Sequence, residues 1–132
     1  LLAALLEWND LTLSAPTAAS ISAKDQEAMQ SLKHFLLQNY STKVDLQRLA
    51  QMCYMSKSKL TYLFRMLYGT TIYEFILACR IDRAKELLAD REKKLSEIAA
   101  LVGYERQSSF SAAFHQKTGV TPNEFRRQFW NK

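Results

Sequence analysis

The sequence predicts an all-α fold, and three observations lead to this prediction. Helix-forming residues dominate the chain of 132 residues, whereas glycine (3) and proline (2), which interrupt helices, are scarce. Hydrophobic residues make up 48% of the chain, which is enough for a core. They recur at helical spacing in several segments. We therefore expect about seven helices, arranged as two helix-turn-helix subdomains that are joined by a long linker helix.

The first part of the chain predicts a short helix, a linker and a longer helix. Residues 1–9 place four leucines on one side of a possible short helix. Residues 11–23 contain few charges and several small side chains, a composition typical of a linker. Residues 25–39 show helical periodicity through Met29, Leu32 and neighbouring positions. Because the chain lacks an initiator Met, we expect it to be a piece of a longer protein.

A helix-turn-helix unit follows at about residues 45–68. Its first helix, 45–53, has Asp45 as a plausible N-cap, and the turn Cys-Tyr-Met-Ser follows it. Its second helix, 57–68, has Ser56 as N-cap and Gly69 directly after its end. The capping residues therefore fix where this unit begins and ends.

The remaining helices follow from the same kind of signal. A long helix is expected at 71–89, then a charged loop at 90–94, and then short helices at 95–102 and 107–118 around a turn at Gly103. The last helix, 122–130, has Thr121 as its cap and proline at its first position, which is a strong start signal.

Two stretches of the chain resemble each other. Residues 46–75 match residues 95–125 with an offset of 49 before the turn and 50 after it. The matched features include Ala50 and Ala99, Gly69 and Gly119, and a shared ending -EF. Chance similarity of two amphipathic helices does not explain a matched glycine stop and a matched ending -EF in one register. We therefore predict two copies of one helix-turn-helix, the motif whose second helix enters the major groove in DNA-binding proteins.

The outer faces of the two second helices lack acidic side chains. Leu60, Leu63, Phe64 and Leu67 are expected to point inward in the first copy, and Phe110, Ala113 and Phe114 in the second. Ser58, Tyr62 and Arg65, and in the second copy Ser108, Ala112 and His115, are expected to point away. No Asp or Glu lies between Lys57 and Arg65 or between Arg106 and Lys117, where DNA phosphates would repel it.

The charge of the chain is uneven. Residues 1–22 hold two acidic and no basic side chains, whereas residues 23–132 hold all 18 basic and 11 acidic ones and so carry +7. A basic domain favours a nucleic acid or an anionic membrane surface as partner, but charge alone fits a merely soluble basic protein equally well. No segment is a candidate transmembrane span.

The sequence resembles the DNA-binding domain of the AraC/XylS family of bacterial transcription regulators over roughly residues 24–130. The second copy carries the family signature in EIAALVGYERQSSFSAAFHQKTGVTPNEFR, with G-[FY], S-x-F, G-x-[TS]-P and a final [FY]-R. RIDRAKELL at 80–88 resembles the linker helix of the family. The whole long helix at 71–89 would span about 28 Å at 1.5 Å per residue, so it could hold two recognition helices in grooves about 34 Å apart.

The resemblance implies which residues contact DNA. Base contacts are expected from Ser58, Thr61, Tyr62, Gln107, Ser108, Ser111 and Ala112. Phosphate contacts are expected from Lys57, Lys59, Arg65, Arg106, His115 and Lys117. Two positions depart from the family pattern. The family often has an Asp or Ser helix cap where Arg106 stands, so Arg106 is expected to reach a phosphate instead. The family often has Arg where Ala112 stands, and the alanine side chain can offer only a methyl contact. Arg80 matches a linker arginine with a structural role.

The resemblance also implies the wider organisation. Residues 23–132 would be the DNA-binding domain of a cytoplasmic activator, and residues 1–22 the tail of, or connection to, a missing upstream regulatory domain. Double-stranded DNA is the expected partner. RNA polymerase and a second copy, bound through that missing domain, are further candidates, and a membrane is not expected.

We expect no enzyme, cofactor or metal site. His34 and His115 lack metal-ligand spacing, and no paired acids, phosphate-binding loop or catalytic triad is evident. Cys53 and Cys79 are expected to be buried free thiols. Two other functions remain open: a helical module that binds a partner protein, and an accessory DNA-binding domain of a larger protein.

Overall fold

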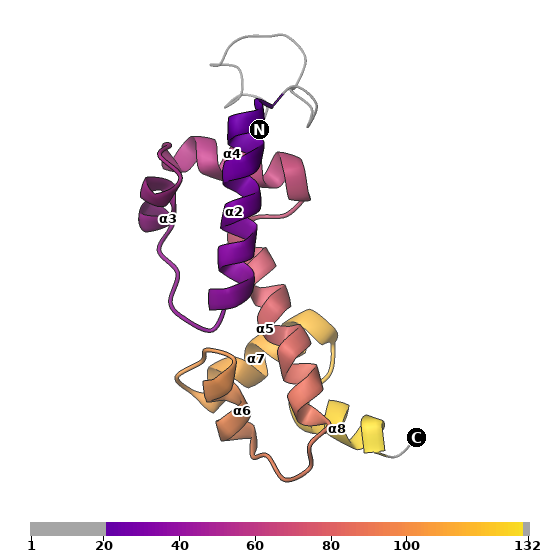
Figure 1. Cartoon of the computed structure of the whole chain (residues 1–132). Helices are drawn as coiled ribbons and strands as arrows, with labels where there is room; N and C mark the ends of the chain where they lie inside the picture. Colours follow the sequence, from indigo (N-terminus) through magenta and orange to yellow (C-terminus); the bar gives the residue numbers. More distant parts are fainter. Residues whose placement is uncertain (1–20, 131–132) are drawn as a thin grey trace.

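The computed structural model describes residues 21–130, and every regular element in this range is a helix (Figure 1). The elements are α2 (Ala23–Asn39), α3 (Leu46–Met52), α4 (Lys57–Tyr68), α5 (Ile72–Leu88), α6 (Leu95–Leu101), α7 (Gln107–Thr118) and α8 (Pro122–Trp130). Helices α2 to α4 gather around one end of α5, and α6 to α8 around its other end. The predicted all-α fold with two helix-turn-helix units on a linker helix is confirmed. The helix predicted at residues 1–9 lies outside the described residues.

Helix α2 begins at Ala23, two residues before the predicted start. The Ser22 hydroxyl accepts a hydrogen bond from the backbone N–H of Asp25 at 3.1 Å, and this cap satisfies a donor of the first turn. The predicted caps of the later helices are confirmed. Asp45 accepts from the N–H of Gln47 at 3.0 Å, and Ser56 accepts from the N–H of Lys59 at 3.1 Å.

Helix α5 contributes to two separate hydrophobic clusters. Its first half buries Ile72 and Ile76 in a cluster with α2, α3 and α4. Its second half buries Ile81, Ala84, Leu87 and Leu88 in a cluster with α6 and α7. Because each cluster holds α5 on one face of its own half, the helix joins the two units as a strut.

The two units repeat the same internal contacts. The rings of Phe64 and Phe75 meet edge to face with centroids 5.7 Å apart, and the matching rings of Phe114 and Phe125 do so at 5.6 Å. Ala50 on α3 and Ala99 on α6, which match in the sequence repeat, are both buried. These contacts confirm that the sequence repeat is a repeat in structure.

Helices α5 and α8, which follow α4 and α7, begin with the same capping box. The N–H of Thr71 donates to the carboxylate of Glu74 at 3.0 Å, and the N–H of Glu74 donates back to the Thr71 hydroxyl at 3.1 Å. Thr121 and Glu124 exchange the same two bonds at 2.8 and 3.0 Å. Each pair satisfies two donors at a helix start, so it stabilises the junction between α4 and α5 or between α7 and α8.

Arg80 joins the two units. Its side chain donates to the carbonyl oxygens of Tyr40 at 2.7 Å and Thr42 at 3.2 Å in the first unit. Its guanidinium also lies over the ring of Tyr104 in the second unit, 5.0 Å from the centroid. The structural role expected for Arg80 is therefore confirmed.

Arg126 on α8 makes a similar set of bonds within the second unit. Its side chain donates to the carbonyl oxygens of Leu88, Asp90 and Lys93 at 2.9 to 3.1 Å. In both units an arginine from the supporting helix therefore satisfies carbonyl groups where one helix ends and a loop begins.

Gly103 lies at the contact between the units. Its φ of +106° is a conformation that favours glycine, and a Cβ there would lie 2.7 Å from the carbonyl oxygen of Ser41. Only a residue without a side chain fits here, so Gly103 lets the two units approach closely.

Cys53 and Cys79 are free and half-buried rather than fully buried. Burial raises the pKa of both thiols, and Asp82 adds to the effect at Cys79. A raised pKa disfavours the thiolate, the form that acts as a nucleophile or metal ligand. Within residues 21–130, no helix combines the length and apolar character that crossing a membrane requires.

Candidate nucleic-acid interface

Helix α4 is held by an apolar inner face and by caps at both ends. Leu60, Leu63 and Phe64 are buried against the first unit. At the C-terminal end, Gly69 has a φ of +73° and donates its N–H to the carbonyl oxygen of Arg65 at 2.8 Å. The helix is thus fixed in position while its other face remains exposed.

Helix α7 has the same inner face and the same C-terminal cap. Phe110 and Phe114 are buried, and Gly119, with a φ of +86°, donates its N–H to the carbonyl oxygen of His115 at 2.8 Å. Its N-terminus differs, since Arg106 occupies the N-cap position and makes no side-chain hydrogen bond there. This confirms that Arg106 caps poorly, and its exposed guanidinium can reach outward beside the first turn.

The structure leaves most of the predicted contact residues exposed on the outer faces of the two helices. The exposed ones are Lys57, Ser58, Thr61 and Arg65 in the first unit, and Arg106, Gln107, Ser108, Ala112, His115 and Lys117 in the second. Ser111 is half-buried. The Thr61 hydroxyl donates to the carbonyl oxygen of Lys57 at 2.7 Å, which leaves its oxygen able to accept a hydrogen bond. Neither face carries an acidic side chain.

Tyr62 does not point directly away from the core, and that part of the prediction is wrong. Its ring packs against the first hydrophobic cluster, its hydroxyl oxygen is buried, and this burial raises the pKa of the phenol. A tyrosine ring gains more by covering apolar surface than by standing in water, and helical spacing alone does not show which way it leans. A base contact from Tyr62 would require the side chain to turn outward.

Lys59 has a partner that sequence reasoning missed. Its ammonium lies 3.2 Å from the carboxylate of Asp25, a residue in the first turn of α2. The two residues are 34 positions apart, so no local pattern could have paired them. Of the predicted phosphate contacts in the described part of the chain, Lys59 is the one that forms an ion pair.

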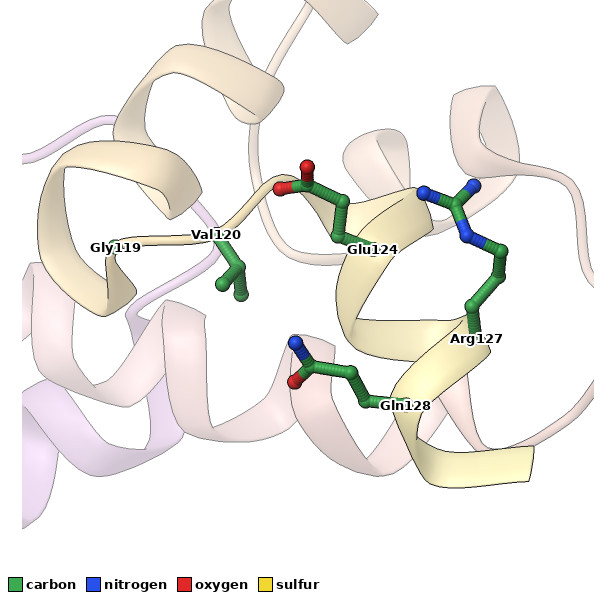
Figure 2. Close-up of a pocket in the computed structure, with 5 residues that line it drawn as sticks. All are labelled: Gly119, Val120, Glu124, Arg127 and Gln128. Atoms are coloured by element: carbon green, nitrogen blue, oxygen red, sulfur yellow. The ribbon is translucent and has the colours of Figure 1, made fainter. Parts of the chain in front are cut away.

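An open pocket lies beside the C-terminal end of α7 and is lined by Gly119, Val120, Glu124, Arg127 and Gln128 (Figure 2). The Glu124 carboxylate is already bound by the N–H of Thr121, and this bond is the main reason why its pKa is lowered. The side chain of Gln128 points toward Val120, whereas Arg127 extends away from it. No Ser, Cys or His is among the residues that line this pocket.

Elsewhere in residues 21–130, no three His, Cys, Asp or Glu side chains lie together in a way that could hold a metal ion. What the two helices present is therefore hydrogen-bonding groups and positive charge on exposed surfaces. Such surfaces suit the recognition of a polyanion by contact.

Comparison with known proteins points to one family. A family model described as "Helix-turn-helix domain" matches residues 49–128, which is more than half of the chain. A probable transcriptional regulator, LumQ of Photobacterium leiognathi, is 32% identical over 119 residues, covering 86% of this chain and 48% of LumQ. The bifunctional transcriptional activator and DNA repair enzyme AdaA of Bacillus subtilis is 31% identical over 103 residues, covering 78% of this chain and 49% of AdaA.

A solved structure shows the same fold. It is a transcriptional regulator from Chromobacterium violaceum, described as having an AraC-type DNA-binding domain, with a TM-score of 0.69. The match has 24% identity and covers 82% of this chain and 96% of that one. The chain spans about half the length of the two curated relatives above, so these likenesses concern this domain and not their remaining parts.

Proposed function

Because the chain belongs to the AraC-type helix-turn-helix family of transcription regulators, we propose that it binds double-stranded DNA sequence-specifically with α4 and α7 in successive major grooves. The observation that carries this proposal is the pair of outer faces described above. Both are exposed, both lack acids, and both are held by the same ring contact and the same capping box. A basic surface that arose by chance would not be expected twice, each time on a helix that is held by the same ring contact and the same capping box.

The placement of α4 and α7 supports two separate points of entry. Each helix packs in its own hydrophobic cluster, and the clusters lie on successive halves of α5 (Figure 1). With 17 residues, α5 is about 25 Å long, which approaches the repeat of about 34 Å between major grooves on one face of DNA. Two helices on one rigid strut would therefore contact two sites about one turn apart.

The predicted contact residues divide into two groups by chemistry. Ser58, Thr61, Gln107 and Ser108 offer short hydrogen-bonding groups that suit base edges, whereas Ala112 offers only a methyl group. Ser111 is half-buried, so it would contact a base only if the DNA approached α7 closely, and the Tyr62 side chain would first have to turn outward. Lys57, Lys59, Arg65, Arg106, His115 and Lys117 would bind phosphates, which fix position without specifying sequence.

We further propose roles that depend on the parts of the protein outside this domain. The whole protein would act in the cytoplasm as an activator, with RNA polymerase as a partner and with dimerisation through an upstream domain. One specific observation favours a second candidate: the likeness to AdaA, whose name pairs activation with DNA repair. In that case this domain would deliver a separate enzyme to DNA and would itself take no part in the chemistry.

Selection of bound duplexes from a random DNA pool at two salt concentrations tests the proposal. We expect enrichment of two short blocks about one helical turn (roughly 10 bp) apart. Binding should weaken steeply as salt rises, because phosphate contacts release counterions. A single enriched block would mean that one helix makes only backbone contacts. No enrichment at either salt concentration would overturn the proposal in favour of a protein-binding module.

A further inference from the structure

The two helix-turn-helix turns have the same backbone shape. In the first, the N–H of Met55 donates to the carbonyl oxygen of Ala50 at 3.1 Å, and in the second the N–H of Tyr104 donates to that of Ala99 at 2.9 Å. Each bond spans five residues and closes around a residue with positive φ. That residue is Tyr54 in the first turn, at +56°, and Gly103 in the second, at +106°. Helix ends of this kind normally place glycine there.

Tyrosine is an unfavourable choice for that position. A residue with a Cβ is strained at positive φ, and bulky side chains are found there less often than Asn or Asp. Among residues 21–130, Tyr54 is the one non-glycine residue with positive φ. Its side chain is 93% exposed, so packing within the domain does not offset the strain. The ring therefore has no stabilising role inside the fold that would explain its presence.

The second turn shows why the two positions differ. A Cβ at Gly103 would lie 2.7 Å from the carbonyl oxygen of Ser41 and 3.0 Å from the guanidinium carbon of Arg80, so a side chain is excluded. Tyr54 has no such neighbours, as its exposure shows. The first turn can therefore carry a side chain where the second cannot, and the chain places a large aromatic one there.

The surroundings of Tyr54 fit a polyanion. The residue stands two positions before Ser56, the N-cap of α4. No acidic residue occurs from Leu46 to Tyr73, whereas Arg48, Lys57, Lys59 and Arg65 all lie in this range. In helix-turn-helix proteins the N-terminal residues of the recognition helix approach the base edges. With α4 in a major groove, the turn just before that end would lie near the sugar–phosphate backbone at the rim of the groove.

We propose that Tyr54 is a DNA-backbone contact that only the first unit possesses. Its ring would pack against a deoxyribose, and its hydroxyl would donate a hydrogen bond to a phosphate oxygen. The inference rests on the proposed DNA-binding function and adds a residue to it. It also makes the two units unequal, because Gly103 cannot make the equivalent contact.

The test uses the whole chain, an enriched duplex from the random pool, and three variants. Tyr54→Phe removes only the hydroxyl, and Tyr54→Gly removes the side chain while giving the turn its preferred residue. Tyr73→Phe is the matched control, because Tyr73 is another exposed tyrosine, on α5. We expect about two- to fivefold weaker binding for Tyr54→Phe, about three- to tenfold for Tyr54→Gly, and no change for Tyr73→Phe.

Two further readouts separate a contact from a structural defect. The thermal midpoint of Tyr54→Gly should be no lower than that of the original chain, because glycine relieves the strain at positive φ. The dependence of binding on salt should keep its slope, because tyrosine carries no charge that displaces a counterion. The loss should also be similar for different DNA sequences, since a backbone contact does not select bases.

The outcomes are distinct. If the original chain binds DNA and both Tyr54 variants bind as tightly, the inference is wrong and the DNA-binding proposal stands. If only Tyr54→Gly is weak while its midpoint is maintained, the ring contact holds and the hydroxyl contact is wrong. If the original chain binds no duplex, the proposed function itself fails, and the assignment of Tyr54 fails with it.

Discussion

The ammonium of Lys59, a half-buried residue in the first turn of α4, lies 3.2 Å from the carboxylate of Asp25 at the start of α2. This ion pair joins α4, one of the two proposed DNA-binding helices, to α2, the first helix in the described part of the chain. A phosphate that binds Lys59 would have to compete with Asp25. If Lys59 binds a phosphate as proposed, the ion pair would oppose DNA binding at this point.

We predict that Asp25→Asn binds DNA more tightly, by about threefold at low salt, because Lys59 becomes available to a phosphate. The slope of log affinity against log salt concentration should steepen by about 0.9, the value for one additional phosphate contact. Titration of a fixed duplex at several salt concentrations measures both quantities. As control, Asp25→Asn in a Lys59→Gln background should have no such effect. An unchanged affinity would show that Lys59 does not face a phosphate.

Substitutions on the outer faces should fall into two classes. Gln107→Ala should cost about 1–3 kcal/mol for the preferred sequence and relax the preference at one position, because it removes a base contact. Lys57→Ala and Arg65→Ala should weaken binding to all sequences alike and lower the salt slope by about 1 each. Parallel selection from a random pool and salt titration distinguish the classes. An equal loss of affinity for all DNA sequences in all three variants would show that Gln107 does not contact a base and that the division into base and phosphate contacts is wrong.

Gly103→Ala should destabilise the domain more than Gly119→Ala. Both positions have positive φ, so alanine costs about 1–2 kcal/mol at each. At Gly119 nothing lies within 4 Å of an added Cβ, whereas at Gly103 the Ser41 carbonyl oxygen lies 2.7 Å from it. That clash should add about 1–3 kcal/mol. Urea unfolding of the two variants measures the difference in their free energies of unfolding. Equal losses of stability would mean that the close contact between Gly103 and Ser41 contributes nothing to the stability of the domain.

The capping boxes predict a dependence of stability on acid. Hydrogen bonds from the backbone N–H groups of Thr71 and Thr121 are the main cause that lowers the pKa of Glu74 and Glu124 below the ordinary value of 4.5. Their ionised forms thus stabilise the folded state above about pH 4.5, and this contribution is lost as the pH falls through the lower folded-state pKa.

A Glu74→Gln/Glu124→Gln double variant should accordingly lose less stability than the original chain between neutral pH and pH 3. Thermal midpoints across this range provide the measurement. Glu27→Gln, an exposed residue on α2 outside both capping boxes, is the control and should follow the original chain. Parallel curves for the double variant and the original chain would show that the capping boxes do not titrate with folding.

The features that the sequence predicted correctly are local ones. Caps such as Ser56 and Thr121 act on amides within three residues, and glycine stops such as Gly69 and Gly119 act at the adjacent helix end. The repeat then allowed each unit to support the interpretation of the other. The all-α fold and the order of its helices followed from these signals alone.

The features that the sequence did not predict join distant segments or depend on how one side chain leans. Lys59 meets Asp25 across 34 residues, and Arg126 meets Leu88 across 38. Tyr62 lies at a position that helical geometry assigns to the outer face, yet its flexible ring folds back onto the first cluster. The turn at residues 53–56 was expected, but the positive φ of Tyr54 was not, because glycine usually marks that conformation.

The matched capping boxes and ring pairs have a consequence for how such a protein can evolve. A pair of packed rings supports each unit, namely Phe64 with Phe75 and Phe114 with Phe125. Neither pair involves an exposed residue of α4 or α7. Mutations on the outer face of one helix should therefore leave the packing of both units unchanged. After duplication of an ancestral unit, each copy could diverge toward its own half of a binding site. A regulator built in this way can follow drift in one half of its operator by changes in a single helix.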